Sequence, residues 1–140
     1  MQVNIAILAD YVEVINGKLY IMGGGVENIF AGTVPTKHPS LGIAFRLSLS
    51  PAELGRTHEL EILLVNADGG RIATVKAKIQ AERPVQGTGG WPVSVPLAIN
   101  FAQIEFSALG GYQFELMVNN SSIHNIPFRV VQAPASQKPA

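Results

Sequence analysis

The stretch Val93-Ser94-Val95-Pro96-Leu97-Ala98-Ile99-Asn100-Phe101 decides the fold class of this chain. Every second residue is large and apolar, and the residues between them are small or polar. A period of two is the period of a β-strand that buries one face. Pro96 cannot donate a backbone hydrogen bond, so we expect this strand to lie at a sheet edge or to carry a bulge.

The same alternation recurs along the chain, in stretches bounded by Gly, Pro, Asn or Asp. The other predicted strands cover residues 3–9, 12–15, 19–22, 41–49, 60–64, 73–79, 112–118 and 126–130. Hairpin loops join them, and no long helical pattern occurs. The sequence therefore predicts an all-β fold, an immunoglobulin-like antiparallel β-sandwich of about eight strands, with a closed barrel as the rival.

Several short signals refine this prediction. Asn16-Gly17 suits a type I′ turn, because both central positions of that turn need a positive φ. Gly23, Gly24 and Gly25 follow a strand but lack the Lys-Ser/Thr of a phosphate-binding loop, so we predict a bulge or sharp chain reversal.

Other segments are predicted less sharply. Ser50-Pro51-Ala52-Glu53 is typical of one helical turn with a capping box. Residues 26–33 are ambiguous and allow a short strand. Residues 34–40 contain two prolines and are predicted to be a loop, and residues 102–109 allow a short helical turn.

Tyr112 precedes Phe114 by two residues at the start of a late strand. In immunoglobulin-like sandwiches a tyrosine at this spacing hydrogen-bonds upstream backbone at a corner, and Phe114 would stand where antibody domains have cysteine. Tyr112 is therefore a candidate structural residue; the alternative is an ordinary aromatic residue of a strand.

Composition indicates one domain, residues 1–131, followed by a disordered tail, residues 132–140. The chain has 47% hydrophobic residues, 14% charged residues and no net charge. It therefore lacks the basic surface of a nucleic-acid binder or of a polybasic membrane anchor. It contains no Cys, no signal peptide pattern and no membrane-spanning stretch. We predict a cytoplasmic protein with no nucleic-acid or membrane partner.

Several of these motifs resemble a family of small bacterial proteins of unknown function. The resemblance rests on Ala6-Ile7-Leu8-Ala9-Asp10-Tyr11, Asn16-Gly17-Lys18-Leu19, Ile21-Met22-Gly23-Gly24-Gly25, His38-Pro39, Ser50-Pro51-Ala52-Glu53 and Gly110-Gly111-Tyr112-Gln113-Phe114. It covers most of residues 3–131. It implies a β-sandwich and no activity, because none of these motifs is a known active site.

The sequence shows no catalytic or metal-binding pattern. His38, His58 and His124 are the three imidazoles, and no two of them have the spacing of metal ligands. Glu59 and Glu61 share one strand face, where we expect them to lie opposite Lys76 and Lys78 across a hairpin rather than to act as an acid–base pair. We predict a protein that is not an enzyme, with no metal and no cofactor.

Three residues are candidates for binding. Asp10 and Tyr11 interrupt an apolar run, and Trp91 stands in a glycine-proline loop, where it either contacts a partner or covers an open end of the sandwich. Because the chain has few charged residues, it has few of the lysines and inward-pointing charges that prevent an edge strand from pairing with another chain. We therefore place the contact region in the N-terminal hairpin. The alternative is that residues 3–9 form a central strand covered on both faces.

The predicted function is protein interaction or self-assembly into a homo-oligomer. The alternative is a small-ligand or carbohydrate-binding module, for which Trp91 and Tyr20 would be the aromatic residues.

Overall fold

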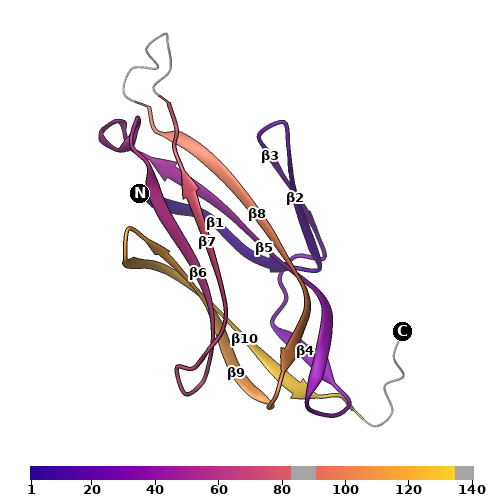
Figure 1. Ribbon diagram of the computed structural model, residues 1–140. Helices are drawn as coiled ribbons and strands as arrows, with labels where there is room; N and C mark the ends of the chain where they lie inside the picture. Colours follow the sequence, from indigo (N-terminus) through magenta and orange to yellow (C-terminus); the bar gives the residue numbers. More distant parts are fainter. Residues whose placement is uncertain (83–90, 135–140) are drawn as a thin grey trace.

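The structure, a computed structural model, describes residues 1–82 and 91–134. These residues form ten strands and one 3-10 helix (Figure 1): β1 (Gln2–Ala9), β2 (Tyr11–Ile15), β3 (Lys18–Met22), β4 (Asn28–Ala31), β5 (Thr36–Leu49), η1 (Pro51–Glu53), β6 (His58–Asn66), β7 (Arg71–Ile79), β8 (Val93–Phe106), β9 (Gly110–Val118) and β10 (Ser121–Gln132). The all-β prediction is confirmed.

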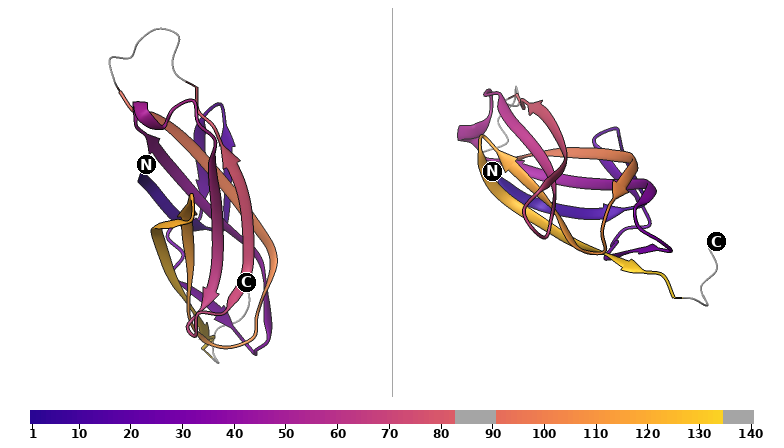
Figure 2. Two further views of the ribbon diagram at one scale, coloured as in Figure 1. Left: turned by 60° about the vertical axis from the view of Figure 1, so that its left-hand side comes forward. Right: turned by 60° about the horizontal axis from the view of Figure 1, so that its bottom comes forward.

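Two sheets face each other across the core (Figures 1 and 2). The first has the strand order β1-β5-β8, and the second has the order β4-β10-β9-β6-β7. Rings from the two sheets meet between them: the centroids of Phe101 and Phe114 are 5.3 Å apart, and Phe106 packs edge-on against both Tyr112 and Phe128. A third, separate sheet is the β2–β3 hairpin.

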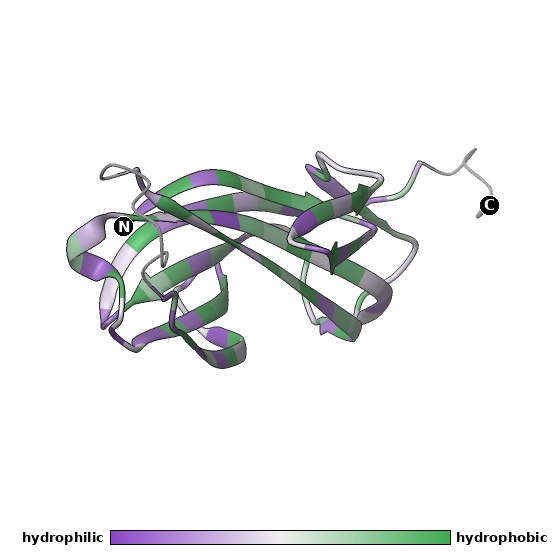
Figure 3. Cartoon of the chain, turned by 90° about the horizontal axis from the view of Figure 1, so that it is seen from above, coloured by the Kyte–Doolittle hydropathy of each residue, from purple (hydrophilic) through white to green (hydrophobic). Residues whose placement is uncertain are grey.

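The alternation of the sequence explains which residues enter the core. Figure 3 shows hydrophobic and hydrophilic residues alternating along the strands. On β5, the residues Leu41, Ile43, Phe45, Leu47 and Leu49 are fully buried. They meet Leu60, Ile62 and Leu64 of β6 and Phe114 and Leu116 of β9 in one apolar cluster. Each of these strands therefore contributes every second side chain to the core, as the period of two requires.

The strand count and pairing differ from the prediction of about eight antiparallel strands. Residues 26–33, which were ambiguous, contain β4, and β4 pairs in parallel with β10 from Arg129 to Gln132. That pairing joins segments about a hundred residues apart, and local spacing carries no information on it.

One segment was predicted wrongly, and another had been left open between a helical turn and other structure. Residues 36–40 are not loop but the start of β5, and residues 102–106 are not a helical turn but the end of β8; the two segments pair with each other. Pro39 is tolerated in β5 because β1 ends opposite Gly42. From that point toward Thr36, β5 has only β8 beside it, so one of its edges needs no backbone donor.

The first strand is an edge strand, so the alternative of a central strand for residues 3–9 is wrong. β1 pairs only with β5, and a bulge interrupts the pairing between Val3 and Ile5. β8, which contains Pro96, also lies at an edge. At the other end of the chain, β10 continues to Gln132, one residue into the predicted tail; residues 135–140 of that tail lie outside the described residues.

Candidate functional site

The β2–β3 hairpin forms because its turn has the right residues. Asn16 and Gly17 have φ angles of 51° and 73°, so both central positions are left-handed and the predicted type I′ turn is confirmed. Ile15 pairs with Lys18 directly beside the turn, and Tyr11 pairs with Met22 at the other end. The hairpin stands beside β8 and is joined to the body at its base (Figure 1).

One face of the hairpin is attached to the outer side of the three-stranded sheet. Val12 is fully buried against Ala9 and Ala44, and Leu19 and Ala98 pack around this small cluster. The sheet side of the contact consists of small residues. A Cβ atom on Gly42 would lie 3.0 Å from a methyl group of Val12 and 3.1 Å from its backbone nitrogen. The glycine therefore allows β2 to approach the sheet closely.

Asn100 holds the hairpin by hydrogen bonds that imitate a neighbouring strand. Its side-chain Oδ1 accepts from the backbone N–H of Val12 at 3.0 Å, and its Nδ2 donates to the carbonyl oxygen of Val12 at 2.7 Å. Ser40 adds a bond from its hydroxyl to the Asp10 carbonyl oxygen at 2.9 Å. The sequence reading placed Asn100 on a polar strand face and gave it no role, since nothing near it in sequence points to Val12.

The three glycines after β3 return the chain to the body. Gly23 and Gly25 have positive φ angles, and a Cβ atom on Gly23 would collide with the Asp10 carboxylate. Gly24 passes between Ile7 and Ile21, where a Cβ atom would lie 3.0 Å from each side chain. The backbone N–H of Gly25 then donates to the Leu8 carbonyl oxygen at 2.8 Å. These contacts describe a sharp chain reversal that needs three small residues.

The opposite face of the hairpin points to solvent and is largely apolar. The alternation places six side chains on it: Tyr11, Glu13, Ile15, Lys18, Tyr20 and Met22. All six are exposed. Met22 is 66% exposed, Tyr20 49% and Tyr11 43%. We call these six residues the outer face of the hairpin. It presents two aromatic and two aliphatic side chains with one charge of each sign.

The predicted binding residues do not form one site. Asp10 and Tyr11 are both exposed at the base of the hairpin, and Tyr11 is part of its outer face. Trp91 is 73% exposed and lies two residues before β8 begins, whereas the hairpin contacts β8 further along, at Ala98 and Asn100. Residues 83–90 of the predicted glycine-proline loop lie outside the described residues. The sequence reading did not single out Met22 and Ile15, although their alternation with Tyr20 and Tyr11 across an Asn-Gly turn was a usable signal.

Asp10 also influences a histidine at the base of the hairpin. Burial lowers the pKa of His38 below its ordinary value, and this effect outweighs the Asp10 carboxylate and a backbone hydrogen bond at Ser40, both of which raise the pKa. His38 is therefore neutral at physiological pH and adds no charge to the base of the hairpin.

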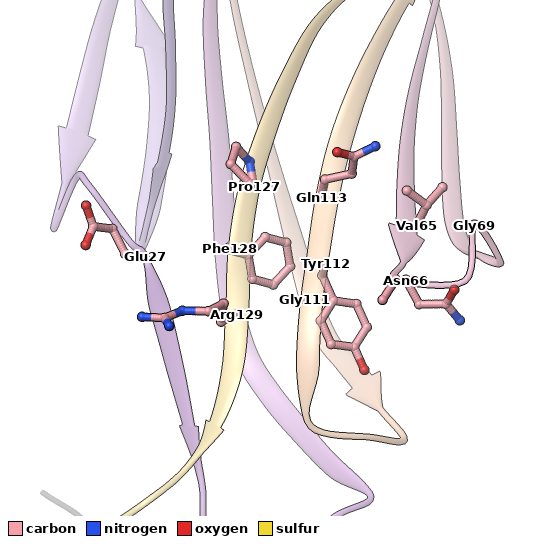
Figure 4. Close-up of a pocket in the computed structure, with 11 residues that line it drawn as sticks. Glu27, Val65, Asn66, Gly69, Gly111, Tyr112, Gln113, Pro127, Phe128 and Arg129 are labelled. Carbon is pink, nitrogen blue, oxygen red and sulfur yellow. The ribbon is translucent and has the colours of Figure 1, made fainter.

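A second surface feature is an open groove on the outer side of the five-stranded sheet (Figure 4). It has a volume of about 650 Å³ and extends over β9 at Gly111 and Gln113, with Val65 on one side and Pro127 and Arg129 on the other. Polar groups line it, namely Asn66, Gln113, Glu27 and Arg129. Arg129 donates from Nε to Asn28 Oδ1 at 3.1 Å. Tyr112 and Phe128 also line the groove, although both are buried, at 6% and 3% exposure. Neither ring is therefore exposed for stacking on a sugar ring.

Five further titratable residues have structural surroundings that match no catalytic pattern. Glu59 pairs across the hairpin with Lys78 and Glu61 with Lys76, which confirms the predicted arrangement of opposite charges. His58 is buried; its Nε2 donates to the Glu53 carbonyl oxygen at 2.8 Å, and its Nδ1 accepts from Asn119 Nδ2 at 3.1 Å.

Within residues 1–82 and 91–134, no group of three or more His, Asp or Glu side chains could hold a metal ion. In the same residues, no helix is long and apolar enough to cross a membrane.

Comparison with known proteins gives a family and no activity. A family of unknown function, DUF6941, matches residues 4–131. No curated protein matches the chain. Among solved structures, an alkylpurine DNA glycosylase, AlkC, from Pseudomonas fluorescens, bound to DNA containing an abasic site analogue, aligns over 89% of this chain and 30% of its own, with 11% identity and a TM-score of 0.42. A glycosyl hydrolase family 2 member from Bacteroides cellulosilyticus aligns over 71% of this chain and 14% of its own, with 12% identity and a TM-score of 0.38.

Proposed function

Because this chain belongs to DUF6941, a family of unknown function, we propose its function from its own surface: a non-enzymatic module that binds a protein chain through the β2–β3 hairpin. The observation that carries this proposal is the outer face of the hairpin, where Tyr11, Ile15, Tyr20 and Met22 are all exposed. Aromatic and methionine side chains on a projecting element are the residue types that contribute most to protein–protein contacts.

The exposed apolar residues are concentrated on the hairpin. Twelve large hydrophobic residues are exposed in the described residues, and six of them lie between Tyr11 and Met22: Tyr11, Val14, Ile15, Tyr20, Ile21 and Met22. Single exposed apolar residues are ordinary on a protein surface, but a contiguous group on one small element marks an interaction site.

The low charge of the chain supports the same proposal. Only 14% of the residues are charged, against about 25% in a typical domain, and the net charge is zero. An apolar contact with another protein therefore meets little electrostatic repulsion. The absence of Cys supports a cytoplasmic location as part of this proposal.

We also keep the immunoglobulin-like description of the fold as a proposal. It is supported by the hydroxyl of Tyr112, which donates to the carbonyl oxygen of Ala108 four residues upstream at 2.6 Å. A tyrosine corner makes a bond of this kind.

The test uses the wild type, one double variant and one single variant as bait in a native lysate of the source organism. The captured proteins are identified by mass spectrometry. Tyr20→Ser with Met22→Ser removes the apolar outer face of the hairpin. Phe30→Ser is the matched control, because Phe30 is 55% exposed on β4, away from the hairpin. We expect the first variant to lose at least tenfold of every specifically captured protein, its own copies included, and the control to lose none.

Equal capture by both variants would contradict the proposal, and so would a wild-type chain that captures nothing and stays monomeric at all concentrations.

A second candidate function is small-ligand binding in the groove around Gly111. Four polar residues converge there on an apolar floor, which is the usual composition of a ligand site. A Cβ atom on Gly111 would have no atom within 4 Å, so Gly111→Leu fills the groove without a clash. A metabolite screen by thermal shift should then find compounds that stabilise the wild type and not Gly111→Leu. A screen in which both proteins respond alike would exclude this function.

A further inference from the structure

We propose that the partner of the hairpin is a second copy of this chain, with the two β3 strands pairing antiparallel across a two-fold axis. This inference rests on the proposed function, because it names the partner of the same hairpin and places that partner at the edge strand β3. It follows from the edge of β3, which has no second strand beside it among residues 1–82 and 91–134, and from the symmetry of its residues.

The turn determines which backbone groups of β3 are free. A two-residue turn closes on a hydrogen-bonded pair, here Ile15 and Lys18, and hydrogen-bonded pairs alternate with pairs that are not bonded. Leu19 and Ile21 therefore direct their N–H and C=O groups away from β2. Val12, the partner of Ile21, agrees with this alternation, because its N–H and C=O point outward to the side chain of Asn100.

Each of the other sheet edges in the described residues carries a feature that hinders strand pairing. On β2, Asn100 occupies the backbone groups of Val12. On β1 a bulge follows Val3, and the carbonyl oxygen of Leu8 accepts from both Gly25 and Val26.

The same holds for the edges of the large sheets. Pro96 interrupts β8, and β7 carries Lys76 and Lys78. β4 is only four residues long. Short strands, lysines, prolines and bulges are the devices that prevent edge pairing. β3 contains no proline and no bulge, and its single lysine, Lys18, lies at its end.

The residues of β3 fit a second copy of themselves. With Tyr20 on the two-fold axis, Leu19 stands opposite Ile21 of the second copy, and Ile21 stands opposite Leu19. These are the residues with free backbone groups, so both pairs exchange two hydrogen bonds each. Tyr20 then faces Tyr20 of the second copy in a non-bonded pair, where side chains are closest and aromatic pairs are favourable. The contact is isologous, as in most homodimers.

Charge also favours a second copy over a charged partner. The outer face of the hairpin carries one acid, Glu13, and one base, Lys18, and the whole chain has no net charge. Lys18 stands opposite Met22 of the second copy in this register, where its alkyl stem packs and its ammonium reaches water. Two like charges do not meet anywhere along the paired β3 strands. We therefore expect a dimer whose affinity changes less than twofold between 50 and 500 mM salt.

A cysteine at the two-fold axis tests the register. The chain has no Cys, so Tyr20→Cys introduces a single thiol. Facing residues of a non-bonded antiparallel pair have Cα atoms about 4.5 Å apart, within the range of a disulfide. Phe30→Cys is the control, with an equally exposed thiol on another edge strand. With oxidised glutathione we expect disulfide dimers at least ten times faster with Tyr20→Cys than with Phe30→Cys.

A charge pair provides the second measurement. Tyr20→Lys places two ammonium groups face to face and should make the chain monomeric by sedimentation, as should Tyr20→Glu. An equimolar mixture of the two variants should restore the dimer, because opposite charges then meet. Circular dichroism checks that each variant keeps the fold.

The outcomes separate this inference from the proposed function. The pairing of two copies is refuted if the wild type is strictly monomeric and Tyr20→Cys cross-links no faster than Phe30→Cys. The proposed function still stands in that case if the Tyr20→Ser, Met22→Ser variant fails to capture a different protein that the wild type captures. A wild-type dimer that Tyr20→Lys leaves intact uses another surface and overturns the pairing of β3 with a second copy. The capture experiment then decides the proposed function by itself.

Discussion

Tyr112 connects the core to a chain corner through a single hydroxyl group. Its ring is buried, lies 5.0 Å from Phe106 and 5.7 Å from Phe128, and its hydroxyl donates to the Ala108 carbonyl oxygen. The ring and the hydroxyl therefore contribute separately, the first by packing and the second by fixing the turn before β9.

We expect Tyr112→Phe to lower the free energy of unfolding by about 1 kcal/mol, the typical net contribution of one hydrogen bond, because the bond to Ala108 is part-buried. The ring packing stays, so the loss measures the hydroxyl alone. Urea denaturation of both proteins gives the value. Tyr20→Phe is the matched control, because Tyr20 is exposed, and its midpoint should not move. An unchanged midpoint for Tyr112→Phe would make Tyr112 an ordinary aromatic residue of a strand.

Glu53 is the residue whose ionisation depends most clearly on the fold. Partial burial raises its pKa, but hydrogen bonds from the N-terminal ammonium, 2.7 Å away, and from Ser50 outweigh that effect and lower the pKa to about 2. The carboxylate holds the start of β1 against η1.

The pKa of Glu53 in the unfolded chain is about 4.5 and in the folded chain about 2. The unfolded state thus binds the proton first, so this stabilisation is complete above pH 4.5 and is lost as the pH falls toward 2. We expect Glu53→Gln to reduce the fall in melting temperature between pH 5 and pH 2.5 and to have its largest effect at pH 7. A parallel pH profile for both proteins would contradict this origin of the acid sensitivity.

At the scale of elements, the hairpin is attached to the body over a small area. Val12 is the one fully buried side chain of the hairpin. The side chain of Asn100 makes two hydrogen bonds to the backbone of Val12. Because Val12 belongs to a small cluster separate from the main core, we expect the hairpin to separate from the sheet without unfolding of that core.

Gly42→Val should separate the hairpin in this way. The new side chain would meet the Asn100 amide oxygen at 2.8 Å and the Val12 backbone nitrogen at 3.1 Å. We expect hydrogen exchange to become at least tenfold faster at residues 11–22 and to stay unchanged in β6 and β9. Gly111→Val is the control, because a Cβ atom there meets nothing within 4 Å. Faster exchange throughout the core would mean that the hairpin is part of the cooperative unit.

At the scale of the whole molecule, the apolar cluster between the two large sheets holds the fold together. Its buried members in the described residues extend from Leu8 to Val130. Beyond them, Gln132 donates from its side chain to the Gly32 carbonyl oxygen, and the Ala133 N–H donates to the Ala31 carbonyl oxygen. These two bonds fix the end of β10 beside β4.

Truncation should therefore depend on where the chain is cut. Removal of residues 135–140 should leave the melting temperature within about 1 °C, since the described core ends before them. Removal from Gln132 onward should lower it by about 4 °C or more, because two hydrogen bonds of roughly 1 kcal/mol each are lost. Thermal unfolding followed by circular dichroism measures both. A large loss with the shorter deletion would show that residues 135–140 pack on the body.

The sequence by itself determined the features that depend on local spacing. The period of two specified the strands and their buried faces, and Asn16-Gly17 specified the hairpin turn, because only certain residues adopt its φ angles. The sequence also predicted that Glu59 and Glu61 lie opposite Lys76 and Lys78. A short loop joins the two strands, and the length of such a loop limits the register in which they pair.

Only the tertiary structure decided which distant segments became neighbours. Asn100 binds Val12 across 88 residues, and β4 pairs with β10 across a similar separation. Glycines at positions 42 and 111 acquire their roles from the elements that pass over them or leave them open. No spacing within a strand encodes these contacts, because they arise from the packing of whole sheets. The exposed hairpin face belongs to both levels: its alternation is local, but its exposure follows from the attachment of the opposite face.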